Sequence, residues 1–357
     1  MLGLTLRELT SALRSRHGLS AYHAEALFGT VYSEGHADVR GHPRFAARRE
    51  EAALLAAEYA PELPVVESSV SDSEATKVTL RYADGAKVES VLVPMRRHET
   101  ICLSCQVGCA RGCLFCRTGA AGLTRDLSAA EIVAQLMVAR FVLRREADHV
   151  VFMGMGEPMD NLAEVLQSIR VLTDQRGLAV PHSGISVSTV GEPAGIRALA
   201  RLAASGPRSG WRNVHLAVSL SAPDDQVRKL LVPSSRSADM AEIRSALEEY
   251  CGANDGTRLF VSYVLVPGVN DRAEHATALA AYLRGLRSCV NLIPLNSGGG
   301  PFRSPTWEEV RAFFDALVGA GQLAKLRASR GNGIRAACGQ LATPGPRAER
   351  VRAATAD

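Results

Sequence analysis

Aromatic side chains and long apolar runs are scarce in this chain of 357 residues. Phe, Trp and Tyr make up 5% of it, so the composition does not indicate an aromatic surface on which nucleic-acid bases would stack. No apolar run reaches the length of a membrane span. Charged residues recur through the first two dozen positions, unlike a secretion signal. We therefore expect a cytoplasmic protein without membrane contact.

The chain also lacks a dominant charge sign. Its net charge is +4 and its pI is near 8.7, which permits a polyanionic partner without requiring one. What it has instead is clustered cysteine: of eight cysteines, five lie between residues 102 and 116. In a reducing compartment this clustering favours a metal cluster or redox chemistry over a disulfide framework.

Apolar spacing divides the chain into regions. Residues 1–65 show helical periodicity and are predicted to form a small helical domain. Residues 66–98 contain two alternating segments that flank Asp84-Gly85, which indicates a β-hairpin. Residues 346–357 are rich in Pro, Ala and Arg and are predicted to be a flexible tail.

Residues 99–345 have a different pattern, in which short apolar strands alternate with amphipathic helices. Strands are predicted near 149–154, 184–189, 213–220, 258–266 and 289–295, and helices over 128–145, 160–175, 192–204, 239–252, 272–286 and 305–320. Such alternation indicates βα units and a parallel sheet. The expected fold class is therefore α/β, a partial (β/α)6 barrel with its site at the carboxyl ends of the strands.

Cys109, Cys113 and Cys116 form a C-x3-C-x2-C motif. Three thiolates can hold three irons of a [4Fe–4S] cluster and leave the fourth iron open. A structural zinc site would normally recruit a fourth protein ligand, and none is obvious nearby. In its βα context the motif resembles that of the radical SAM superfamily, in which S-adenosylmethionine (SAM) chelates the fourth iron. The segment VVFMGMGEP, with Gly156 and Glu157, resembles the superfamily segment that binds the methionine amine.

A longer string of motifs resembles the RlmN/Cfr family of RNA methyltransferases. The motifs occur in that family's order: C-x6-C-x3-C-x2-C, MGMGEP, STVG, SLSAPDD, VPGVND, NLIPLN and AACGQL. The helical N-terminal segment fits the family's accessory RNA-binding domain. The resemblance implies an enzyme that uses a [4Fe–4S] cluster and two SAM molecules per turnover to methylate an sp2 carbon of adenosine.

The same resemblance assigns three catalytic residues. Cys338, in AACGQL, would carry a methyl group from the first SAM, and the second SAM would activate that methyl group for addition to the base. Glu89 would remove the ring proton. Cys102 would then attack the Cys338 sulfur and release the product, leaving a transient Cys102–Cys338 disulfide.

Contacts with SAM also carry over by position. They are Gly156, Glu157, Ser188, Ser219, Leu220, Ser221 and Asn296. The chain departs from the family at Ser221, where a His is usual, at Arg335, where an acidic residue is usual, and at Cys105, where Ser is usual. Arg111, Arg117 and Arg125, with residues 95–99, are either phosphate contacts around the cluster or scattered surface residues.

Several functions remain open at this stage. The leading one is methylation at carbon 2 of an adenosine in large-subunit rRNA, with tRNA as a second candidate substrate. The alternatives are methylation at carbon 8, a radical SAM reaction on a substrate other than RNA, and a non-enzymatic iron–sulfur or zinc protein. We expect a monomer that takes electrons from a reductant such as flavodoxin.

Overall fold

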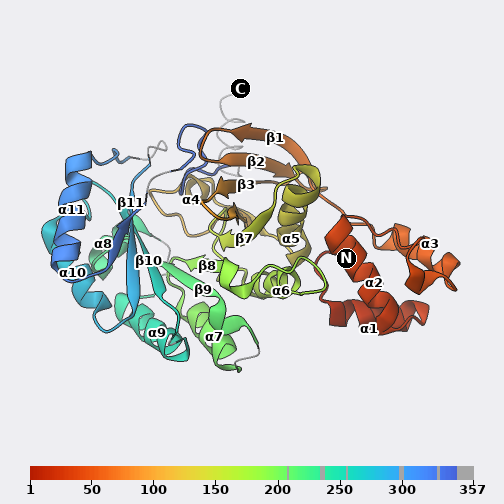
Figure 1. Ribbon diagram of the computed structural model, residues 1–357. Helices are drawn as coiled ribbons and strands as arrows, with labels where there is room; N and C mark the ends of the chain where they lie inside the picture. Colours follow the sequence, from red (N-terminus) through yellow and green to blue (C-terminus); the bar gives the residue numbers. More distant parts are fainter. Residues whose placement is uncertain (207–208, 234–237, 255, 297–300, 328–329, 344–357) are drawn as a thin grey trace.

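The computed structural model describes residues 1–206, 209–233, 238–254, 256–296, 301–327 and 330–343. Its N-terminal part is helical, as the apolar spacing predicts. The helices there are α1 (Leu6–His17), α2 (Ala21–Glu34), the 3-10 turn η1 (Pro43–Phe45) and α3 (Arg49–Glu58). Thr5 begins α1 with a capping box that it forms with Glu8. Figure 1 shows these helices grouped beside the rest of the molecule.

A ten-stranded sheet runs through the remainder of the described chain in the order β1-β2-β3-β4-β7-β8-β9-β10-β11-β12. Its strands are β1 (Val65–Ser71), β2 (Thr76–Arg81), β3 (Lys87–Pro94), β4 (Glu99–Cys102), β7 (Ala147–Phe152), β8 (Ile185–Thr189), β9 (His215–Ser219), β10 (Leu259–Leu265), β11 (Ser288–Pro294) and β12 (Ala324–Leu326). Strands β1 to β4 pair antiparallel, and from β4 to β12 every pairing is parallel.

The predicted hairpin is confirmed and is continuous with the barrel sheet. Strands β2 and β3 meet at a tight turn in which Gly85 has a left-handed φ of 84°, a conformation that favours glycine. Strand β3 then pairs with β4, with Val91 opposite Cys102. The division into domains at residues 65 and 98 stays a prediction, and residues 346–357 lie outside the described part of the chain.

Helices connect the parallel strands, since such strands need crossovers. They are α5 (Ala129–Met137) with its π-helical continuation η2 (Val138–Val142), α6 (Leu162–Leu172), α7 (Pro193–Ala204), α8 (Asp225–Leu231), α9 (Met240–Ala253), α10 (Ala273–Leu283) and α11 (Trp307–Gly319), with the 3-10 turns η3 (His182–Gly184) and η4 (Trp211–Asn213). The partial α/β barrel is confirmed (Figure 1). Among the strands and α-helices from β7 onward, the sequence analysis missed α8 and β12, because seven and three residues are too few to show a period.

No helix in the described ranges is both long enough and apolar enough to traverse a bilayer. The parallel strands are apolar for another reason: helices cover them, and nearly all residues of β10 and β11 are buried. Their shared direction brings the carboxyl ends of β4, β7, β8, β9, β10 and β11 to one edge of the sheet. The candidate site lies at this edge.

Candidate active site

The cysteine motif lies in the connection that follows β4. This connection contains β5 (Gln106–Gly108), α4 (Arg117–Ala121) and β6 (Leu123–Asp126). Gly108 has a φ of 82°, and a Cβ there would lie 1.9 Å from the carbonyl oxygen of Gly122, so only glycine fits. Cys109 and Cys113 are buried and Cys116 is half-buried. The backbone thus presents all three thiols on one compact loop.

The thiols of the loop influence one another's pKa values. The pKa of Cys109 is raised to about 12, chiefly by burial, with a smaller upward contribution from Cys116 and an opposing one from a backbone hydrogen bond at Arg111. The pKa of Cys113 is also raised, first by burial and then by Cys116 and Cys109. Thiols in such surroundings stay protonated unless a metal binds them, because a thiolate is the ligand form.

This donor set fits an iron–sulfur cluster better than a single ion. No three His, Cys, Asp or Glu side chains of the described ranges stand together as the ligands of one metal ion. A [4Fe–4S] cube takes one thiolate per iron, so its cysteines stand farther apart than the ligands of one ion. Cys109, Cys113 and Cys116 are the residues that would hold it.

Glu157 joins the loops that follow β7 and β8. Its side chain is 3% exposed, and its two carboxylate oxygens accept hydrogen bonds from the backbone N–H groups of Met159 (3.0 Å) and Val190 (2.9 Å). Burial raises its pKa. Gly156 has a φ of 105°, and a Cβ there would lie 2.7 Å from that of Gln106, so glycine is needed for this close approach. A carboxylate oxygen has a second lone pair, which leaves Glu157 able to accept from a ligand amine.

The other predicted SAM contacts fall on neighbouring strands. Ser188 on β8 pairs with Ala217 on β9, two residues before Ser219, so the two half-buried serines share a face of the sheet. Leu220 is buried, and its N–H donates to the carbonyl of Ser262.

Ser221 has a different environment from the two strand serines. It is fully buried, with a left-handed φ of 52°. Its hydroxyl accepts a hydrogen bond from the N–H of Val264 at 3.3 Å. In this structure that hydroxyl joins the turn after β9 to the backbone of β10. The contact of Ser221 with SAM remains a prediction.

Cys338 lies where the predicted catalytic residues meet. It is exposed, and its carbonyl oxygen accepts a hydrogen bond from the side chain of Asn296 at 3.2 Å. The pKa of Cys102 is raised to about 12, first by burial and then by the nearby Cys338. The net shift of the Cys338 pKa is upward and is caused first by desolvation of the thiol; the charge of Arg327 opposes the shift and Cys116 adds to it. The charge of Cys338 thus influences Cys102, although 236 positions separate the two residues. The residue after Cys338 is hydrogen-bonded to the cysteine loop, since the carbonyl of Gly339 accepts from the N–H of Arg117.

Glu89 reaches the same segment from β3. Its side chain is 8% exposed, forms an ion pair with Lys77 (Nζ to Oε1, 3.0 Å), and accepts a hydrogen bond from the N–H of Ala342 (2.9 Å). The sequence analysis did not identify Lys77. The sequence did contain a signal for Lys77. In a hairpin that turns at Asp84-Gly85, side chains alternate between the two faces, and this alternation places Lys77 and Glu89 on the same face.

The segment around Cys338, residues 330–343, is held at several points. The N–H of Arg117 donates to the carbonyl of Gly339 (2.8 Å), and the Thr118 hydroxyl donates to that of Leu341 (2.6 Å). The Thr343 hydroxyl donates to the carbonyl of Lys87 (3.0 Å). The segment thus bridges the cysteine loop and the hairpin.

Comparison with known proteins agrees with this geometry. Residues 103–280 match the model of the Radical SAM superfamily. The chain is 36% identical to the dual-specificity RNA methyltransferase RlmN of Caulobacter vibrioides, over 98% of this chain and 87% of the relative. The chain belongs to the RlmN family. It is also 40% identical to a probable RlmN of Thermus thermophilus, over 80% of this chain and 79% of that one.

A solved structure extends the likeness to the fold. A radical SAM methyltransferase from Sphaerobacter thermophilus is 39% identical and superposes with a TM-score of 0.85, covering 96% of this chain and 98% of the other. As a member of the RlmN family, the protein is a SAM-dependent methyltransferase with a [4Fe–4S] cluster. When bound, the cluster and SAM supply the radical that starts the chemistry.

The structure corrects one reading of the basic residues that this RlmN-family chain carries around the cluster. Arg111 is 2% exposed and pairs with Asp160 (2.5 Å) and Glu192 (3.1 Å), so it is not a phosphate contact. Arg125 pairs with Asp84 and Glu131, each at 2.7 Å. Both guanidinium groups are committed to carboxylates of the protein.

Cys105 is distinguished from Cys102 by its surroundings. It is 2% exposed, and burial raises its pKa well above the ordinary value. Cys102 is more accessible and lies beside Cys338. Of the two thiols, Cys102 is therefore the better placed to exchange with Cys338.

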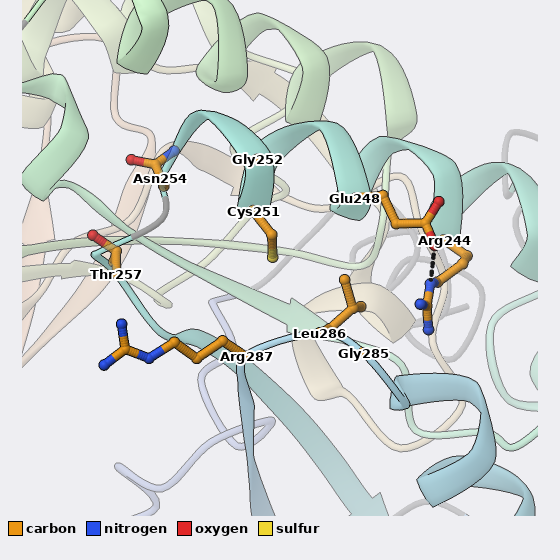
Figure 2. A pocket seen from close by; sticks show the side chains of 9 residues that line it. All are labelled: Arg244, Glu248, Cys251, Gly252, Asn254, Thr257, Gly285, Leu286 and Arg287. Carbon is orange, nitrogen blue, oxygen red and sulfur yellow. Dashed lines mark hydrogen bonds and ion pairs between the residues drawn. The ribbon is translucent and has the colours of Figure 1, made fainter.

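A separate cavity of about 500 Å³ lies away from this site. It is bordered by the end of α9, including Cys251, and by Gly285–Arg287, which precede β11 (Figure 2). These residues are at the amino ends of β10 and β11, opposite the edge that carries Cys338. None of the predicted site residues lines this cavity.

Proposed function

We propose that this enzyme methylates a ring carbon of adenosine in RNA through a methyl group carried on Cys338. Carbon 2 of an adenosine in large-subunit rRNA is the favoured target, and tRNA is the second substrate. The observation that supports the proposal is that the segment carrying Cys338 is hydrogen-bonded both to the cysteine loop, at Arg117, and to Glu89, at Ala342. An iron–sulfur protein without this reaction has no use for these three residues together.

Each of these residues has one task. The Cys338 sulfur takes a methyl group from SAM and, once that methyl group is activated, its carbon bonds to the adenine ring. Glu89 accepts the ring proton. The Cys102 sulfur then attacks the Cys338 sulfur, the bond between that sulfur and the new methyl carbon breaks, and a disulfide forms. Reduction of this disulfide restores the enzyme.

The SAM contacts belong to the same proposal. Gly156, Glu157, Ser188, Ser219, Leu220, Ser221 and Asn296 are the residues we expect to surround SAM at the carboxyl edge of the sheet. Support comes from the positions of Glu157, Ser188 and Asn296 at the ends of β7, β8 and β11. We further propose a cytoplasmic monomer that receives electrons from a reductant such as flavodoxin.

A trapped covalent intermediate tests this proposal. Cys102→Ala protein from a bacterial host is expected to carry RNA joined to the Cys338 peptide, because the resolving thiol is missing. Cys251→Ala, a half-buried cysteine at the opposite end of the barrel, is the matched control and is expected to carry none. Mass spectrometry of nuclease-treated peptides identifies the adduct, and sequencing the attached fragment names the nucleotide.

The other outcomes are decisive. If the product nucleoside is methylated at carbon 8, then carbon 8 and not carbon 2 is the target of this enzyme. A Cys338 peptide with only a methyl group would indicate a substrate absent from the host and favour a target other than RNA. Unmodified Cys338 in protein with an intact cluster would refute the mechanism.

A further inference from the structure

Lys77 lies where the hairpin meets the segment that carries Cys338. In the register of β2 and β3, Thr79 is opposite Glu89 and Lys77 is opposite Val91, so Lys77 and Glu89 are diagonal neighbours on one face. Val91 is in turn opposite Cys102 on β4, which puts Cys102 on that face too. The face therefore carries the base and the resolving thiol proposed above, with a lysine beside them.

The ion pair of Lys77 with Glu89 is largely shielded from water. The side chains are 16% and 8% exposed, and Nζ lies 3.0 Å from Oε1. The second oxygen of Glu89 accepts the hydrogen bond from Ala342. With a donor on each oxygen, the carboxylate is held in one orientation, and a charge-assisted bond of this kind is stronger than a neutral one.

Lys77 also contacts the Cys338 segment directly. Its Nζ lies 3.4 Å from the carbonyl oxygen of Arg335. Arg335 has a left-handed φ of 54°, a conformation that is strained for a non-glycine residue. Lys77 and Glu89 thus bind the segment on both sides of Cys338, at Arg335 three residues before it and at Ala342 four residues after it.

We propose that Lys77 is a positioning residue for Glu89 in the step that removes the ring proton. This inference rests on the proposed function. Radical addition leaves one unpaired electron on the adduct, which the iron–sulfur cluster of the established activity would take up. The C–H bond of the ring carbon then breaks, the proton passes to Glu89, and the electron pair of that bond stays in the ring. The Cys102 thiol then loses its proton as its sulfur bonds to the Cys338 sulfur, and the bond between the Cys338 sulfur and the methylene carbon breaks. The electron pair of that bond stays on the methylene carbon, which takes up a proton to become the methyl group. Lys77 holds the accepting carboxylate in place relative to Cys338 and exchanges no atom.

The test compares lysine variants of the full chain expressed in a bacterial host. Lys77→Met is expected to slow release of the product about tenfold to a hundredfold, so that the Cys338–RNA adduct accumulates. Methylation of Cys338 and iron content stay as in the wild type, because Lys77 acts after those steps. Lys77→Arg keeps a cation and restores part of the release rate. Lys87→Met is the matched control, since Lys87 pairs with Glu67 at 2.8 Å on a more exposed part of β3.

The measurements are the adducted fraction on a denaturing gel, the mass of the Cys338 peptide and the melting temperature. Normal release by Lys77→Met, while Glu89→Gln accumulates adduct, would overturn the role of Lys77 and leave the function standing. A parallel loss of Cys338 methylation and iron would show a structural role only and would also overturn it. Absence of adduct in both Glu89→Gln and Cys102→Ala would instead refute the proposed function. If Lys77→Met does not fold, Lys77→Gln serves in its place.

Discussion

Arg111 offers a quantitative test of how the cysteine loop is held. Its guanidinium lies between Cys109 and Cys113 in sequence and joins the loops after β7 and β8 through Asp160 and Glu192. Replacing it by leucine leaves two carboxylates without their cation. Breaking a buried ion pair by removing one partner typically destabilises a protein by about 3–5 kcal/mol.

Two features reduce that magnitude. Asp160 and Glu192 are 13% and 25% exposed, so water can solvate part of the charge they would leave. In addition, Nη1 of Arg111 is buried without a hydrogen-bond partner among the described residues, and removing this unsatisfied group lowers the cost of the substitution by about 1 kcal/mol. We therefore expect Arg111→Leu to lower the free energy of unfolding by about 2–3 kcal/mol.

Arg125→Leu is the matched control for this change. Arg125 also has two carboxylate partners, but its side chain is 31% exposed, so its loss should cost about 0–1 kcal/mol. Urea unfolding of the iron-free protein under reducing conditions measures both variants. Equal losses in the two variants would refute the reasoning, as would full additivity of Arg111→Leu with Asp160→Asn in a double-mutant cycle.

Two further predictions concern acid stability and thiol reactivity. The hydrogen bonds from Arg303 and the Thr306 backbone lower the pKa of Glu309 from 4.5 to about 2. The stabilisation that results is present above the ordinary pKa and is lost as pH falls through the folded value. Urea midpoints of Glu309→Gln should accordingly lose less on acidification than those of the wild type, and parallel curves would contradict this. Alkylation of the native iron-free protein should modify the exposed Cys338 well before the buried Cys105, as peptide mass spectrometry would show; equal rates would disprove the distinction between these thiols.

Local patterns in the sequence predicted much of the fold. The turn at Asp84-Gly85 was predictable because tight hairpin turns need a residue with positive φ, and glycine adopts that conformation readily. The strands from β7 to β11 and their helices were predictable because burial imposes a period on apolar residues. The spacing of Cys109, Cys113 and Cys116 predicted a cluster-binding loop by itself, since three thiols so close in sequence must lie on one loop.

The sequence resembled the family strongly enough to nominate Cys102, Cys338 and Glu89, but chain order does not bring them together. Cys338 reaches Cys102 because residues 330–343 bridge the cysteine loop and the hairpin through hydrogen bonds between positions more than 200 apart. No periodicity encodes such contacts.

Charged residues show the same division. From the sequence, Arg111 and Arg125 were equally basic and equally suited to phosphate. Only packing showed that carboxylates neutralise both, three of them from distant loops and one, Glu131, from the nearby start of α5. The sequence by itself determined the period of burial, the turn and the cysteine spacing. Tertiary structure decided which charges are paired, which thiols are accessible and that the segment carrying Cys338 reaches Lys77 and Glu89. These properties depend on neighbours that the chain supplies from far away.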